Sequence, residues 1–174
     1  MSYNLLKGKR GIIFGALNDA SIAWKVAERV VEEGAQIVLT NTAVACRMGT
    51  IDELAKKTSA TIIPADATSV EDLNNLFVKA QEALGGKIDF VLHSCAMSVN
   101  MRKKRTYDDL DYGFLDKTLD ISAISFHKML QVAKKLDALN DEASVLALTY
   151  VASHRTFFGY NDMADAKSLL ESIA

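Results

Sequence analysis

Short apolar runs rich in β-branched residues alternate along the chain with longer stretches of helical period, and this alternation constrains the fold more than any other feature. Five of the runs are predicted strands, at Arg10–Phe14, Gln36–Thr40, Thr61–Pro64, Ile88–His93 and Ser144–Tyr150. Near-continuous apolar strands separated by helices are typical of a parallel sheet covered on both faces. Right-handed crossovers then favour a doubly wound α/β sheet in the order 3-2-1-4-5.

The stretches between these runs carry the apolar spacing of helices. Predicted helices span Ser21 to Gly34, Ile51 to Lys57, Ser69 to Leu84 and Asp116 to Leu136, and a last one begins near Asn161. Ser69 and Asp72 are spaced like a capping box at a helix start. No linker or longer repeat interrupts the alternation, so we expect residues 1–174 to form a single domain.

The balance of charge excludes several classes of function. The 174 residues include 20 basic and 22 acidic side chains, a formal net charge of −2, which leaves no global positive field for nucleic acid or an anionic membrane. No apolar run approaches the roughly 20 residues that cross a bilayer. Two cysteines, Cys46 and Cys95, form no disulfide framework, which indicates a reducing cytoplasm, and we expect both to be buried small hydrophobic side chains.

Ligands of such sheets bind outside the carboxyl ends of the strands, so the residues after each strand carry the candidate site. Gly15 follows the first strand, and the small side chains of Ser21 and Ala23 flank Ile22 at the start of the next helix. A helix N-terminus offers unpaired N–H groups and a positive dipole end, so a pyrophosphate could bind there. Ser21 could instead simply cap its helix.

Two further strand ends, those of the third and fourth strands, carry small or polar residues. Asp66 and Ala67 follow the third strand, where the carboxylate could accept a hydrogen bond from an adenine amino group or could close a turn. Ser94, Cys95 and Ala96 follow the fourth strand and leave room for a flat cofactor.

The second strand is followed by Asn41 and Thr42, which provide neither an acid for the 2′-hydroxyl of NAD nor an arginine for the phosphate of NADP. The nearest cation is Arg47. The three histidines show no metal-ligand spacing, so the sequence predicts no metal site.

The strongest cluster lies near the end of the sequence, where Tyr150 closes the fifth strand and Tyr160 precedes Lys167 by seven residues. Seven positions are close to two helical turns, so we expect Tyr160 and Lys167 to project on the same side of the last helix. A lysine beside a phenol lowers the pKa of the phenol and makes it a better proton donor or oxyanion stabiliser. A surface tyrosine and a surface lysine are the alternative.

Together, Gly15-x5-Ser21-x-Ala23, Asp66, His93-Ser94-Cys95-Ala96 and Tyr150 with Tyr160-x6-Lys167 resemble the bacterial enoyl-acyl carrier protein reductases, a divergent branch of the short-chain dehydrogenase/reductase family. Ordinary members of the larger family have Tyr-x3-Lys, and a serine where this chain has Tyr150. The resemblance implies a dinucleotide-binding Rossmann domain and the NADH-dependent reduction of trans-2-enoyl-acyl carrier protein, the last step of fatty acid elongation.

The resemblance also implies the role of each site residue. Tyr160 would hydrogen-bond the thioester carbonyl and stabilise an enolate, Lys167 would hold the nicotinamide ribose hydroxyls, and Tyr150 would line the acyl pocket. The residues implied to surround NADH are Gly15, Ser21, Ile22, Ala23, Thr42, Asp66, Ala67, Ser94, Cys95 and Ala96, and Ala96 and Met97 would also meet the substrate.

Family members are homotetramers and run about half as long again, so we expect later strands to be missing from this chain. Such a shortened chain would be inactive, or would be a non-catalytic cofactor-binding fragment. A carbonyl reductase of the same fold is a further alternative, which the tyrosine spacing disfavours. The basic run Arg102–Arg105 would either touch the acidic carrier protein or lie in a solvated loop.

Overall fold

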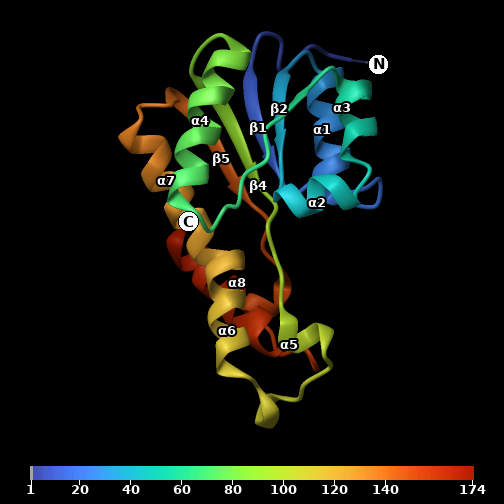
Figure 1. The fold of residues 1–174 in the computed structure, drawn as a ribbon, viewed down its shortest axis with the longest axis vertical. Coiled ribbons are helices and arrows are strands. Elements are labelled where there is room, and N and C mark those ends of the chain that lie inside the picture. The colour runs from blue at the N-terminus through green and yellow to red at the C-terminus, as the bar shows by residue number, and fades with distance from the viewer. Residues whose placement is uncertain (1) are drawn as a thin grey trace.

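The computed structural model describes residues 2–174, and its centre is one parallel sheet (Figure 1). The strands are β1 (Arg10–Phe14), β2 (Gln36–Thr40), β3 (Thr61–Ile62), β4 (Ile88–His93) and β5 (Leu139–Ala147). They lie in the order β3-β2-β1-β4-β5, and every neighbouring pair is parallel. The predicted fold class and strand order are therefore confirmed.

Each face of the sheet packs against its own layer of apolar side chains. Ile12 and Phe14 of β1 belong to a cluster with α4 (Val70–Leu84), α7 (Ser125–Lys135) and the end of α8 (Asn161–Ile173). Ile13 points to the opposite face, where it packs with α1 (Ile22–Glu32) and α3 (Ile51–Thr58). Successive side chains of a strand therefore pack into two different cores. Burial of each large apolar side chain contributes roughly 1.5–3 kcal/mol to the stability of the fold.

Two strands differ from their predicted bounds. β3 ends at Ile62 and not at the predicted Pro64, although the N–H groups of Ile63 and Ala65 still donate to the Leu39 and Asn41 carbonyls. β5 begins at Leu139, five residues before the predicted start, and ends at Ala147. The register with β4 shifts between the pairs Ile88–Leu139 and Phe90–Ser144. This irregularity interrupts the apolar pattern of the strand, so the pattern alone does not predict the early start.

The predicted helix over 116–136 is divided. Asp111 caps α6 (Tyr112–Leu119) by accepting the N–H of Phe114, so the helix begins four residues early. A π-helical turn at Asp120–Ile124 then leads into α7. The sequence did not predict the short helices α2 (Ala43–Met48) and α5 (Val99–Arg102), or the 3-10 turns Tyr107–Asp109 and Val151–Ser153.

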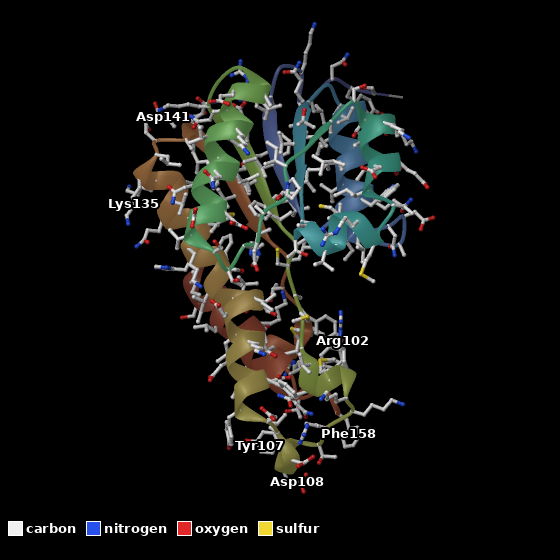
Figure 2. All side chains as sticks on the ribbon, in the orientation of Figure 1. Arg102, Tyr107, Asp108, Lys135, Asp141 and Phe158 are labelled. Atoms are coloured by element: carbon white, nitrogen blue, oxygen red, sulfur yellow. The ribbon has the colours of Figure 1, made fainter. Side chains whose placement is uncertain are left out.

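Residues 98–119 and 150–166 project beyond the carboxyl edge of the sheet, and we call them the helical extension (Figure 1). Tyr107, Asp108 and Phe158 point outward at its tip (Figure 2). Within residues 2–174, none of the helices has the length and apolarity required to cross a membrane.

Candidate active site

The loops after β1 and β4 touch backbone to backbone at the carboxyl edge of the sheet. Gly15 has φ +87°, and a Cβ at this position would lie 2.1 Å from the carbonyl oxygen of Ser94. Only glycine fits both the left-handed backbone and this close approach. The sequence placed Gly15 and Ser94 after different strands, and the structure brings them together.

The N-terminus of α1 is open to an anion. Ser21 occupies the capping position, but its Oγ accepts the N–H groups of Leu17 (3.2 Å) and Asn18 (3.1 Å) and none from the helix. The first turn contains no acidic side chain, and Ala23 is fully buried. The interpretation of Ser21 as a side-chain cap is therefore wrong, and the free N–H groups at this end of α1 suit a phosphate.

Asp66 closes the turn after β3. Its Oδ1 accepts hydrogen bonds from the Thr68 backbone N–H (2.9 Å) and the Thr68 hydroxyl (2.7 Å), as in an Asx turn. The residue is exposed, while Ala67 beside it is buried. The turn interpretation accounts for one carboxylate oxygen and leaves the other for an additional donor.

The side chains of Asn41 and Thr42, which follow β2, form hydrogen bonds to the loop after β1 and to the start of α2. Asn41 donates from Nδ2 to the Ala16 carbonyl (3.1 Å), and Thr42 Oγ1 accepts the Ala45 N–H (3.2 Å) at the start of α2. Arg47 lies in the last turn of α2 and is exposed. This strand end therefore presents hydroxyl and amide groups, with the arginine one helix away.

The segment after β4 is held by the π-helical turn. Ser122 Oγ accepts the Met97 N–H (3.1 Å), a contact that sequence reasoning missed because no local pattern marks it. Ser94 and Cys95 are half-buried, and Ala96 is exposed. Burial raises the pKa of the Cys95 thiol to about 12, with Lys167 opposing the shift, so Cys95 stays a thiol at neutral pH.

Lys167 lies under the end of β5 and not on the surface. Its side chain is buried, and its Nζ donates to the Leu148 carbonyl (2.6 Å). Burial lowers the pKa of Lys167. Burial, with a smaller effect of Lys167, also lowers the pKa of His93 to about 4, so His93 is neutral, and its Nε2 lies 2.9 Å from Ser125 Oγ.

Tyr150 and Tyr160 form a stacked pair. Their ring centroids are 4.9 Å apart and their planes differ by 16°. The neighbouring Tyr160 side chain raises the pKa of Tyr150. Tyr160 is the capping residue of α8 and not part of the helix, so the expectation of two residues on one helical face is wrong in this respect. Tyr160 and Lys167 nevertheless both meet residues 148–150, where Lys167 bonds Leu148 and Tyr160 stacks on Tyr150.

Glu171 fixes the segment that carries Tyr150. Its carboxylate accepts hydrogen bonds from the hydroxyls of Thr149 and Ser153 and pairs with His154 Nε2 (2.6 Å). These hydroxyls, first Ser153 and then Thr149, lower the pKa of Glu171. Sequence reasoning missed this residue, although its spacing of four from Lys167 on the same helix is a usable signal.

Two other features lie apart from this cluster. A cavity of about 680 Å³ is lined by residues 104–107 and 152–159 among others, and Tyr150, Tyr160 and Lys167 do not line it. In the basic run, Arg105 pairs with Asp109 (3.0 Å) and Lys103 lies over the Phe114 ring (4.7 Å). Among residues 2–174, no group of three or more His, Cys, Asp or Glu side chains is arranged to hold a metal.

The strand order, the glycine at the first turn and the open end of α1 define an α/β fold of the Rossmann type. A model of the enoyl-(acyl carrier protein) reductase family matches residues 15–174. The chain therefore belongs to the enoyl-acyl carrier protein reductase family.

Named relatives agree with this assignment. The enoyl-[acyl-carrier-protein] reductase [NADH] FabI of Rickettsia bellii is 33% identical over 99% of this chain. The enoyl-[acyl-carrier-protein] reductase [NADH] 1 of Rhizobium meliloti is 36% identical over 97% of it. The solved FabI-NADH complex from Alistipes finegoldii is 71% identical over 99% of the chain, with a TM-score of 0.97.

The matched region covers only part of each relative. The chain spans 64% of the Rickettsia protein, 61% of the Rhizobium protein and 61% of the Alistipes chain, which is less than two thirds of each.

Proposed function

We propose that the protein carrying these residues reduces trans-2-enoyl-acyl carrier protein to acyl-acyl carrier protein with NADH, the last step of bacterial fatty acid elongation. The observation that carries this proposal is the stacked pair of Tyr150 and Tyr160 beside the buried Lys167 at the carboxyl edge of the sheet. The names of the relatives point to the same activity. Residues 1–174 would then form one dinucleotide-binding domain.

The residues present fit NADH. Gly15 keeps the first turn free of a side chain where it meets Ser94, and α1 brings no acid to its first turn. A pyrophosphate is thus favoured at Ser21, Ile22 and Ala23 by free N–H groups and the helix dipole. The side chains assigned to the rest of the cofactor are Thr42, Asp66 and Ala67 near the adenosine, and Ser94, Cys95, Ala96 and Lys167 near the riboses and nicotinamide.

When bound, NADH supplies a hydride, which the β-carbon of the enoyl thioester accepts. The thioester carbonyl oxygen becomes an enolate oxygen, and the Tyr160 hydroxyl stabilises it by donating a hydrogen bond. The α-carbon then takes up a proton, which completes the saturated product. Tyr150 lines the acyl pocket beside Tyr160, Ala96 and Met97, and its stacking on Tyr160 holds the two rings together before substrate arrives.

The proposed partners follow from the same function. The substrate is carried by acyl carrier protein, and the protein would be a cytoplasmic homotetramer. Cys46 and Cys95 are half-buried, where the sequence predicted buried side chains, and both are free thiols, which agrees with a reducing compartment.

The experiment is an NADH oxidation assay with a crotonyl thioester on the whole protein that carries residues 1–174, and the readout is the loss of NADH absorbance. We expect oxidation with the crotonyl thioester and none with the saturated butyryl thioester, which serves as the matched control. No oxidation of NADH or NADPH would contradict the proposal, and a faster reaction with a β-ketoacyl thioester would favour the carbonyl reductase alternative.

A further inference from the structure

The first turn of α8 contains a carboxylate that is fully buried. Asp162 accepts hydrogen bonds from Ser98 Oγ (2.7 Å), Asn100 Nδ2 (2.9 Å) and Thr118 Oγ1 (2.8 Å). All three donors are themselves buried. Both oxygens of Asp162 are thus satisfied by neutral groups, and in the part of the chain that the structure describes no lysine, arginine or histidine forms an ion pair with it.

The three donors come from two elements of the helical extension, α5 and α6. Ser98 caps α5, where its Oγ also accepts the Met101 N–H (3.0 Å). Asn100 lies within α5 and also bonds the backbone of Asp111, and Thr118 lies on α6. Asp162 is therefore the point at which α5, α6 and α8 are joined.

This arrangement is an unfavourable way to obtain stability alone. A buried carboxylate loses its hydration, and well-packed apolar side chains of similar volume often stabilise a fold as well or better. Directional hydrogen bonds, in contrast, fix one arrangement of the elements that they join. The network therefore specifies how the start of α8 sits against α5 and α6.

Tyr160 is the residue whose position depends on that start. It precedes Asp162 by two residues, and its carbonyl accepts the Met163 N–H (2.9 Å). The neighbouring Asn161 is anchored too, since its Nδ2 donates to the Arg105 carbonyl (2.7 Å). On its other side Tyr160 follows the exposed residues 154–159, where the Phe157 ring meets it edge-on (centroids 6.1 Å apart) and the Phe157 carbonyl accepts its N–H (3.3 Å), so the buried part of its support comes from α8.

We infer that Asp162 is a positioning residue, which holds the start of α8 so that the Tyr160 ring stays stacked on Tyr150. This inference rests on the proposed function for its effect on turnover. A displacement of about 1 Å at a reacting group reduces turnover by about a hundredfold, so the hydroxyl of Tyr160 requires such support.

The test compares Asp162→Ala, Asp162→Asn and the matched control Asp165→Asn, which removes a carboxylate from an exposed site on the same helix. Asp162→Ala removes all three acceptor contacts, and kcat should fall about tenfold or more with KM for NADH within about twofold of wild type. Asp162→Asn keeps one acceptor oxygen for Asn100 and Thr118, so its kcat should fall less than that of Asp162→Ala. Asp165→Asn should retain the wild-type kcat.

A wild-type kcat in both Asp162 variants would overturn the inference, as would a rise in KM for NADH that matches the fall in kcat. If Asp162→Ala does not fold, the isosteric Asp162→Asn decides the question by the same criterion.

A second readout does not depend on turnover. With 3-fluorotyrosine at position 160, the wild-type protein should give one sharp fluorine resonance, and Asp162→Asn should give a shifted or broadened one. An unchanged resonance would overturn the inference. If the wild-type protein reduces no enoyl thioester, the proposed function fails, and this resonance still decides the role of Asp162.

Discussion

The sheet buries its central strands β1, β2 and β4 between two apolar layers, whereas the helical extension is joined through hydrogen bonds of Asp162 with Ser98, Asn100 and Thr118. Apolar contacts are non-directional, so they stabilise a fold but tolerate small shifts. Buried hydrogen bonds fail when their geometry is lost. The apolar layers therefore supply the stability of the sheet, and the hydrogen bonds fix the arrangement of α5, α6 and α8, on which the proposed positioning of the stacked tyrosines rests.

The largest expected effect is on the stability of the sheet. Phe77 is fully buried in one apolar layer, so Phe77→Ala should lower the free energy of unfolding by roughly 3–5 kcal/mol. Phe158, a phenylalanine of the extension, is fully exposed, and Phe158→Ala should change that free energy by less than about 0.5 kcal/mol. Urea unfolding measures both, and equal losses would break the comparison.

The next effect concerns the cofactor edge. Gly15→Ala combines a left-handed backbone with a clash against the Ser94 carbonyl, and it should weaken NADH binding at least tenfold. Gly8 has a similar φ of +76° and open space around it. Gly8→Ala should therefore lose more than about 1 kcal/mol of stability while leaving NADH binding intact. Calorimetric titration separates the two, and equal affinities would show that the contact with Ser94 is irrelevant.

The same division explains what the sequence could predict. Apolar period is a local signal, and it located all five strands and the helices that cover them. The partners of Asp162 lie 44, 62 and 64 residues away in the sequence, so no window of sequence contains the network. The sequence did not predict the early start of β5 for a related reason, because its register shift depends on the neighbouring strand β4.

The close approach of Gly15 and Ser94 is the part of the candidate site that the strand ends could predict. Gly15 and Ser94 follow parallel strands, whose carboxyl ends must share one edge of the sheet. The relation of Tyr160 to Lys167 was predicted from helical spacing, but the helix begins at Asn161, whose φ of +38° places the tyrosine outside it. The sequence did not predict the contacts of Glu171, because they depend on how Thr149 and Ser153 fold back onto α8.

A smaller effect should appear on acidification. The hydrogen bonds from Ser153 and Thr149 place the pKa of Glu171 below that of an unfolded glutamate, so the folded state binds this proton less readily. The stabilisation is present above the unfolded pKa and is lost as the pH falls through the folded pKa. Glu171→Gln should therefore show a shallower decline of Tm as the pH falls from about 5 to well below the ordinary glutamate pKa of about 4.3.

The exposed Glu142 provides the control for this titration. Glu142→Gln should keep the wild-type slope of Tm against pH, and a wild-type slope in Glu171→Gln would contradict the assignment.

The smallest effect is expected at the second strand end. No cation lies at Asn41 or Thr42, so NADH should be preferred over NADPH in steady-state kinetics. Arg47→Ala should leave the kinetics with NADH within about twofold of wild type, because Arg47 lies one helix away. A clear preference for NADPH that Arg47→Ala abolishes would identify Arg47 as the residue that binds the phosphate.

The most direct test of the proposed site is a paired measurement of kcat and of the dissociation constant for NADH in Tyr160→Phe and Lys167→Met. The tyrosine hydroxyl is assigned to the enolate and the lysine to the ribose hydroxyls, so the two variants should fail differently. Tyr160→Phe should lower kcat and leave NADH affinity unchanged, whereas Lys167→Met should weaken NADH binding. An unchanged kcat in Tyr160→Phe, or wild-type affinity for NADH in Lys167→Met, would contradict the account.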